Sequence, residues 1–248
     1  MQPQSARFPH TGNSQLGEEF PMTMQVAMVG TDGILLASDL MWAENNLPIR
    51  ASQLSPKIKL SARCDVAVSF ARSMETAGLV ADAILALEDS DWDDPITTLM
   101  AAARGVVEQP TIGRKEIQCL IVSAKPTVAA YFLRVSNMGG CWTPYCQNVI
   151  GYACAGDDTN PAVFWVKRYY EHRPVEALLP LAAQLVVSAS EVNSAGIGGL
   201  EIVTCVAGSI KRLPSDSIDA LESEAQKRSR AIGELVLGSH PRTARAPS

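Results

Sequence analysis

The sequence has few of the residues that most often build metal sites and charge-relay triads. It contains three histidines in 248 residues, and two of them, His10 and His240, lie near the chain ends. The six cysteines form no CxxC pair. A zinc site needs closely spaced His and Cys ligands, and a Ser/His/Asp or Cys/His site needs a histidine within the fold. We therefore expect no metal and no other cofactor, and buried reduced thiols as the state of most cysteines.

The sequence also lacks an excess of basic residues and a long apolar run. Its 21 Lys and Arg residues against 26 Asp and Glu give a net charge of −5, whereas a nucleic-acid-binding protein usually presents a basic face. The longest apolar run, residues 177–189, is interrupted by Pro180 and Gln184 and is too short to cross a bilayer. Residues 1–22 lack the apolar core of a signal peptide. We therefore expect no nucleic acid partner, no membrane and a cytoplasmic location.

Enough apolar material is present for one large core. Hydrophobic residues make up 47% of the chain and charged residues 19%, which suits a single enzyme-sized domain. Three regions are expected from the composition. Residues 1–22 form a disordered leader or propeptide, residues 23–213 a single domain, and residues 214–248 an amphipathic helix near 217–237 followed by a disordered tail.

The middle region alternates between strand-like and helix-like runs. Several of the strand-like runs are continuously apolar, as expected when both faces of a sheet are covered. Two helical pairs and two sets of strands predict an α+β fold, a four-layer α-β-β-α sandwich. The expected helices are 73–87, 95–107, 161–170 and 174–192, and the expected strands are 23–29, 34–38, 57–60, 65–71, 117–123, 128–135, 149–154, 201–207 and 210–213.

The most informative segment is the hairpin that Thr23 opens. An apolar run after Thr23 leads to the pair Asp32-Gly33, and a second apolar run returns to Asp39. An Asp-Gly pair between two apolar runs favours a tight hairpin turn. Because Met22 directly precedes Thr23, removal of everything up to Met22 would leave Thr23 with a free α-amine beside its own hydroxyl. Such an amine can accept the hydroxyl proton and so make the hydroxyl a nucleophile.

This hairpin and the segments after it resemble the start of a mature proteasome β-type subunit, including its bacterial relatives that form simpler rings. The shared marks are a Thr at the head of the hairpin, an Asp-Gly turn, an acidic residue sixteen positions after the Thr (Asp39), and a Lys followed by an aliphatic residue (Lys57-Ile58). The resemblance covers about residues 23–213, and it implies the sandwich fold of the N-terminal-nucleophile (Ntn) hydrolases. Its further segments are 66–71, 73–87, 151–161 and 198–205.

The resemblance implies a role for each of three residues. Thr23 would be the nucleophile and its α-amine the base, Lys57 the cation that lowers the pKa of that amine, and Asp39 the carboxylate that keeps Lys57 charged and aimed. The oxyanion would rest on a backbone N–H near Ala71. Lys59 competes with Lys57, because residues two apart on a strand share a face. Lys57 is preferred because it heads the Lys-aliphatic pair.

The sequence departs from the family pattern around these three residues. The family's Gly-Ser-Gly turn is replaced by Cys-Ala-Gly-Asp at 154–157, and Ala71 stands where a Gly is common. The family also carries an Asp and a second Ser before a Gly-Gly pair, whereas this chain has no carboxylate there and has Ile197 at the second Ser position. Asn193 and Ser194 are the candidates to substitute as supporting residues.

The resemblance therefore implies a threonine-type endopeptidase that hydrolyses peptides or unfolded proteins as a subunit of a homo-oligomeric ring, with room for an ATPase partner. Apolar positions beyond one stripe of helix 73–87 suit a ring interface: Ala77, Leu79, Val80, Ile84 and Leu87. A catalytically silent ring subunit and a small-amide hydrolase stay open as alternatives, because a fold does not fix a substrate.

Two routes would expose Thr23. The family's precursors cut themselves after a Gly, but here the preceding residue is Met22. Translation beginning at Met22, followed by ordinary Met removal, would also leave Thr23 first, and residues 1–21 would then be an upstream extension. Both routes stay open.

Overall fold

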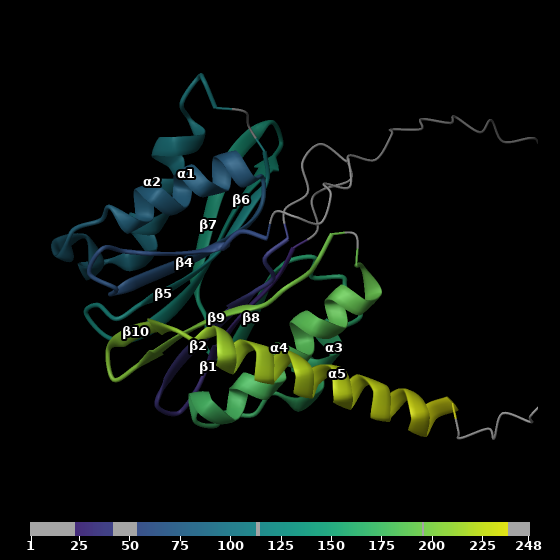
Figure 1. The fold of residues 1–248 in the computed structure, drawn as a ribbon. Coiled ribbons are helices and arrows are strands. Elements are labelled where there is room, and N and C mark those ends of the chain that lie inside the picture. Colours follow the sequence, from purple (N-terminus) through teal and green to yellow (C-terminus); the bar gives the residue numbers. More distant parts are fainter. Residues whose placement is uncertain (1–22, 42–53, 113–114, 195, 238–248) are drawn as a thin grey trace, which may run out of the picture.

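The structure is a computed structural model, and it describes residues 23–41, 54–112, 115–194 and 196–237. Within these residues the chain forms two five-stranded antiparallel sheets, five α-helices and one short 3-10 helix (Figure 1). The leader predicted at 1–22 and the tail predicted at 239–248 lie outside the described residues.

The first sheet contains the hairpin that the Asp-Gly turn predicted. Its strand order is β10-β9-β2-β1-β8. The Gly30 N–H donates to the Gly33 carbonyl at 2.7 Å and closes the turn. Strand β9 approaches Gly33 so closely that a Cβ there would lie 2.1 Å from the Cys205 carbonyl oxygen, so this position requires glycine. The strands are β1 (Met24–Val29), β2 (Gly33–Ser38), β8 (Tyr152–Gly156), β9 (Glu201–Val206) and β10 (Ser209–Arg212).

The second sheet has the order β3-β4-β5-β6-β7. The sequence predicted its first four strands but not the fifth, which covers residues 141–148 and contains Pro144. Proline is tolerated on an edge strand, and β7 is the edge of this sheet. The strands are β3 (Ile58–Leu60), β4 (Val66–Arg72), β5 (Ile117–Ser123), β6 (Ala129–Met138) and β7 (Cys141–Asn148).

The helices agree with the predicted ones to within a few residues. Helix α2 begins at a proline suited to the first turn, and the preceding Asp94 side chain accepts the Thr97 N–H at 3.4 Å. The helices are α1 (Met74–Leu85), the 3-10 helix η1 (Asp89–Asp93), α2 (Pro95–Val107), α3 (Val163–Tyr169), α4 (Val175–Val192) and α5 (Ser215–Leu237).

Three apolar clusters hold these elements together. Helices α1 and α2 pack on the second sheet around Leu99 and the indole of Trp92. Helices α3 and α4 pack on the first sheet around Val166 and Leu185. The third cluster contains residues of both sheets, Leu36 among them, so the two sheets also contact each other. Figure 1 shows α1 and α2 on one side of the sheets and α3, α4 and α5 on the other.

The predicted four-layer α-β-β-α sandwich was wrong. The fold is mixed, about 39% helix and 32% strand, and its two antiparallel sheets and five helices do not clearly match that sandwich. The prediction counted two helical pairs and treated the C-terminal helix as a separate region. Helix α5 instead packs mainly on α4 and buries Ala225 in the same core, which adds a further tier of helix on that side.

The ring surface predicted on helix α1 is mostly buried. Ala77, Val80 and Ile84 are fully buried against the second sheet, and Leu87 packs against the same cluster. Of the five predicted positions only Leu79 is exposed, at 41%. The additional apolar residues of α1 are therefore part of the core, because a wider face of the helix is buried on the sheet than a single apolar stripe would cover.

Helix α4 is the one described helix long and apolar enough, by length and composition, to cross a membrane. More than half of it, 56%, is buried inside the protein, and its Leu178 and Leu185 are part of the core. A core helix of a soluble protein passes the same test. The structure is therefore compatible with a soluble protein.

Candidate active site

Thr23 lies immediately before β1, and its side chain is almost completely buried. Its carbonyl oxygen accepts the Asp157 N–H at 2.8 Å, and the β1–β8 ladder pairs Met24 with Gly156. These contacts hold the residue against the backbone at the end of β8. The position of the Thr23 side chain is therefore set by the end of the first sheet.

Asp39 faces Thr23 because of the hairpin register. Strand pairing places Gln25 opposite Ser38, so Asp39 comes next to the start of β1. The Met24 N–H donates to Oδ1 of Asp39 at 3.0 Å, and the Met41 N–H donates to Oδ2 at 3.1 Å. The carboxylate is fully buried and held by two backbone donors.

Lys57 completes the cluster. Its side chain is fully buried, and its Nζ lies 2.7 Å from Oδ2 of Asp39 and 3.1 Å from Oγ1 of Thr23. The predicted convergence of the three residues is thus confirmed, while their catalytic roles stay predictions. Lys59, the competing residue, instead contacts Asp82 at 2.7 Å on the surface of α1. The two lysines diverge because Lys57 lies before β3 and outside its ladder.

Burial dominates the electrostatics of the Asp39–Lys57 pair. It raises the pKa of Asp39, and the nearby Lys57 ammonium and the two backbone donors oppose this change. Burial also lowers the pKa of Lys57, against the carboxylates of Asp39 and Glu201. The Asp39 carboxylate favours the charged form of Lys57 against this effect of burial. The Lys57 Nζ also donates a hydrogen bond to Oγ1 of Thr23, so it is placed to polarise that hydroxyl.

The predicted oxyanion position, Ala71, lies near the end of β4 and is buried. A polar bridge ties this end of β4 to the start of β1. The Gln25 Nε2 donates to the Phe70 carbonyl at 2.6 Å, and the Ser69 hydroxyl donates to the Gln25 Oε1 at 3.0 Å. Arg72, which follows, has a φ of 78°, a conformation that a non-glycine residue holds only when its surroundings impose it. The oxyanion role of the Ala71 N–H stays a prediction.

Asn193 and Ser194, the predicted supporting residues, follow α4. Asn193 is half-buried and its carbonyl accepts the Ile197 N–H at 3.0 Å, whereas the Ser194 side chain is exposed. The segment reaches the site through its backbone, because the Gly198 carbonyl accepts the Leu40 N–H at 2.8 Å. The supporting contact beside Asp39 is thus made by a main-chain group.

One residue that the sequence did not single out, Glu201, contacts the Lys57 backbone, and a second, Arg212, pairs with Glu201. Glu201, the first residue of β9, accepts the Lys57 N–H and pairs with Arg212 of β10. One sequence signal was available: a carboxylate heads a mostly apolar strand, and a charge there needs a partner once the strand is buried. The sequence gives no indication of which partner it meets.

Other chemistries have little support within the described residues. No group of three or more His, Cys, Asp or Glu side chains there could hold a metal ion. Burial raises the pKa of Cys154, the cysteine nearest in sequence to Gly156, to about 12, so its thiol is a poor nucleophile near neutral pH. The role of the Thr23 hydroxyl as a nucleophile stays a prediction.

Comparison with known proteins adds no identification. A scan against protein-family models found no match, and a search of curated proteins found none either. What this protein does can therefore be inferred only from the geometry around Thr23 and from the sequence resemblance.

Gly156 is expected to be essential for the position of Thr23. Its φ is 91°, and a Cβ there would lie 1.9 Å from the Thr23 carbonyl oxygen. We expect Gly156→Ala to lower the free energy of unfolding by at least about 2 kcal/mol, because backbone must move in a strained region. Urea denaturation measures this loss. Gly105→Ala is the matched control, since its Cβ meets nothing within 4 Å. Equal urea midpoints for the Gly156→Ala variant and the wild type would contradict the expectation.

Proposed function

We propose that this protein is a threonine-type endopeptidase in which the Thr23 hydroxyl is the nucleophile. One observation supports the proposal. Nζ of Lys57 lies 3.1 Å from Oγ1 of Thr23, and the same Nζ lies 2.7 Å from Oδ2 of Asp39. A buried ion pair is weak evidence of stabilisation, because the desolvation of two charges offsets their attraction. The contact of the Asp39–Lys57 pair with the Thr23 hydroxyl, which would lie beside a free α-amine after processing, is better explained by a catalytic role than by stabilisation of the fold.

The proposed reaction uses the α-amine of Thr23 as the base. The amine takes the hydroxyl proton while Oγ1 attacks the carbonyl carbon of the substrate peptide bond. The Lys57 ammonium stabilises the negative charge that develops on Oγ1, and Asp39 keeps that ammonium in place. The C–N bond then breaks, and the leaving amine takes the proton from the Thr23 α-ammonium. A water molecule, deprotonated by the same amine, then attacks the acyl-Thr23 ester. The α-ammonium returns this proton to Oγ1 as the ester C–O bond breaks, which releases the second product and restores Thr23.

This mechanism requires that Thr23 be the first residue of the mature chain. While Met22 is attached, the Thr23 nitrogen is an amide and cannot accept a proton at neutral pH. The reaction is therefore proposed for the processed protein only, in the cytoplasm and on peptides or unfolded proteins.

Intact mass spectrometry of protein from its native host, combined with a hydrolysis assay, tests the proposal. We expect a species whose mass begins at Thr23, and we expect that species alone to hydrolyse a mixed set of fluorogenic peptides. A chain that keeps residues 1–22 in the host would contradict the proposal. Hydrolysis of small amides without peptides would favour the small-amide hydrolase.

A catalytically silent ring subunit is the second candidate, and two buried side chains favour it. Ala155, completely buried in β8 beside Gly156, has no hydroxyl where the resembled family has one. Ile197 is likewise buried and apolar. Hydroxyls at these positions would assist the amine. A mature chain that begins at Thr23 and forms rings without turnover would support this candidate.

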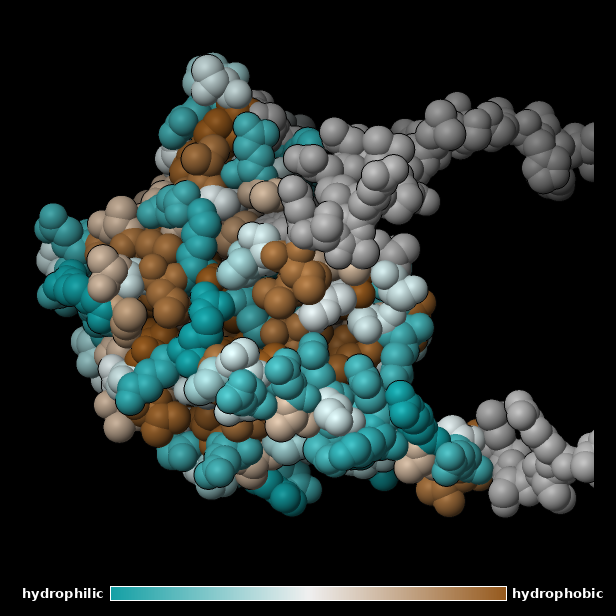
Figure 2. Space-filling view, viewed as in Figure 1, coloured by the Kyte–Doolittle hydropathy of each residue, from teal (hydrophilic) through white to brown (hydrophobic). Residues whose placement is uncertain are grey.

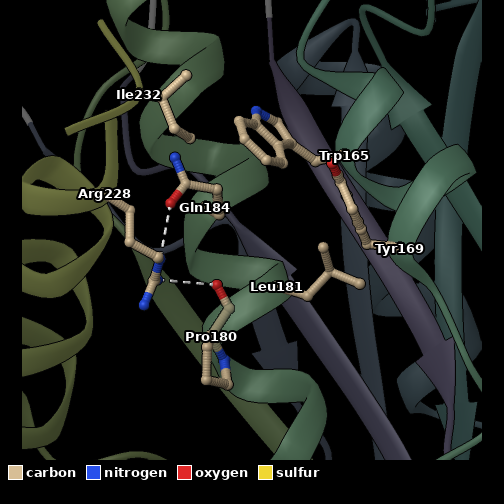
Figure 3. Close-up of a pocket in the computed structure, with 7 residues that line it drawn as sticks. All are labelled: Trp165, Tyr169, Pro180, Leu181, Gln184, Arg228 and Ile232. Carbon is tan, nitrogen blue, oxygen red and sulfur yellow. Dashed lines mark hydrogen bonds between the residues drawn. The ribbon is translucent and has the colours of Figure 1, made fainter. Parts of the chain in front are cut away.

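A homo-oligomeric ring, with an ATPase as a further partner, completes the proposal. Helices α3, α4 and α5 enclose an apolar groove of about 240 Å³, in which Trp165 and Tyr169 face Leu181 (Figure 3). Figure 2 shows hydrophobic atoms at the free end of α5, where Leu235 is 82% and Val236 is 77% exposed. Exposed apolar surface of this kind suits contact with a second copy of the chain.

The ring is expected to appear in solution. Light scattering of the full chain at micromolar concentration should give a mass several times the 26.5 kDa of one subunit. The larger mass should persist on dilution, because a closed ring breaks only when several interfaces are lost. A mass near that of one subunit across the dilution series would contradict the ring.

A further inference from the structure

Glu201 contacts the chain at Lys57 more extensively than a surface carboxylate would. Its Oε1 accepts two consecutive backbone N–H groups, that of Lys57 and that of Ile58, the latter at 2.8 Å. Its Oε2 pairs with the Arg212 guanidinium, which also donates to the Ile58 carbonyl at 2.7 Å. The carboxylate is 5% exposed. Lys57 and Ile58 are thus fixed by side chains of the other sheet.

The register of the first sheet explains why this contact falls beside the candidate site. Strand pairing places Glu201 directly opposite Ser38, the residue before Asp39. Asp39 and Glu201 therefore lie on neighbouring strands at the same end of the sheet. Asp39 holds Lys57 by its amine, at 2.7 Å, and Glu201 holds it by its backbone N–H. Lys57 is therefore held both at its side-chain amine and at its backbone.

We propose that Glu201, supported by Arg212, is a positioning residue that places the Lys57 amine against the Thr23 hydroxyl. The catalytic meaning of this role rests on the proposed function, whereas the placement itself does not. Lysine has a long flexible side chain, so a fixed backbone origin restricts where its amine can lie. A misplacement of about 1 Å costs on the order of a hundredfold in rate.

Glu201 and Arg212 could serve only to hold the two sheets together, but that role does not explain why a carboxylate is buried here. Burial of the carboxylate is unfavourable, as its raised pKa shows, and an apolar side chain would join the sheets without that cost. The carboxylate adds the ability to fix two successive N–H groups of one backbone segment. That segment is the one that carries Lys57.

Two substitutions of Glu201 separate positioning from charge. Glu201→Leu removes the acceptor oxygen, whereas Glu201→Gln keeps an acceptor for both N–H groups and lets the partly exposed Arg212 turn to solvent. In protein that begins at Thr23, we expect Glu201→Leu to lower kcat by at least about 30-fold with KM nearly unchanged. We expect Glu201→Gln to stay within about fivefold of the wild type. Glu224→Leu, an exposed ion-pair partner of Lys227, is the matched control and should have no effect.

A second readout does not depend on activity. With ¹⁵N-labelled lysine side chains, the buried Lys57 ammonium should give a slowly exchanging NMR signal, assigned by its loss in Lys57→Met. We expect this signal in the wild type and in Glu201→Gln, and its loss in Glu201→Leu. If the wild type shows no turnover but the signals follow this pattern, the positioning role stands and the proposed function falls.

An unchanged Lys57 signal and an unchanged kcat in folded Glu201→Leu would overturn the positioning role. Should Glu201→Leu fail to fold, Arg212→Met gives the same test at a side chain that is 37% exposed. We expect it to weaken the Lys57 signal and to lower kcat severalfold without a change in KM. Wild-type behaviour of Arg212→Met in both readouts would overturn the role as well.

Discussion

Replacement of Thr23 by Ala in the mature chain is expected to reduce peptide hydrolysis by at least about a thousandfold, because it removes the proposed nucleophile. The fold should survive. Two contacts at this position do not involve the hydroxyl: the Thr23 carbonyl accepts the Asp157 N–H, and the neighbouring Met24 N–H donates to Asp39. Initial rates on fluorogenic peptides measure the loss, in protein confirmed by mass to begin at residue 23.

Thr23→Ser is the matched variant. It keeps both the hydroxyl and the α-amine, so we expect partial activity, lowered mainly because the smaller side chain is less constrained at χ1. Undiminished turnover in Thr23→Ala would remove this mechanism outright. A loss of turnover together with a loss of fold, seen as an earlier urea transition, would assign Thr23 a structural role instead.

The part of the site that the sequence predicted is the part encoded by local rules. An Asp-Gly turn between two apolar runs specifies a hairpin, and the hairpin register then places Asp39 beside the start of β1. Lys57 came from the resemblance. The rule that residues two apart share a face left Lys59 as a rival, and the rule does not apply because Lys57 lies outside the β3 ladder.

The fold was predicted less well where packing, and not periodicity, decides. The helical pattern of α5 was evident, but nothing in it indicated that the helix would lie on α4. Gln184 of α4 is buried and bonds to both Ser229 and Arg228 of α5. In the sequence Gln184 appears only as a polar interruption of an apolar run. The four-layer sandwich failed because such contacts between distant helices leave no periodic trace.

The contacts of Glu201 were equally out of reach. Residues 144 apart in the chain bond to each other, and neither the strand that Glu201 begins nor the segment of Lys57 carries a motif for the other. Local patterns thus predict the candidate residues Thr23 and Asp39. The groups that hold those residues in place depend on how two sheets meet, and only the structure shows that.

Lys57→Met is expected to be almost as damaging to activity as Thr23→Ala, with a loss of about a hundredfold to a thousandfold in kcat. The reason is that Nζ of Lys57 lies 3.1 Å from Oγ1 of Thr23, where its charge can stabilise the negative charge that develops on that oxygen. Lys59→Met is the control. It removes a half-exposed ion pair with Asp82 and should change neither kcat nor stability appreciably. An equal effect of the two substitutions would contradict the assignment of Lys57.

Lys57→Met should also lower the free energy of unfolding, by an amount that depends on pH. Without Lys57, the buried Asp39 carboxylate loses its cation, which costs about 3–5 kcal/mol at neutral pH. Burial already raises the pKa of Asp39, and removal of the ammonium that opposes this change raises it further. The folded state then binds a proton more readily than the unfolded state. The contribution of Asp39 to stability therefore falls as pH rises from the pKa of Asp39 in the unfolded state to its higher pKa in the folded state.

Urea denaturation of Lys57→Met and of the wild type should therefore show a smaller difference in the free energy of unfolding at acidic pH than at pH 7. A difference that stays constant or widens on acidification would mean that Asp39 does not depend on Lys57 for its charge.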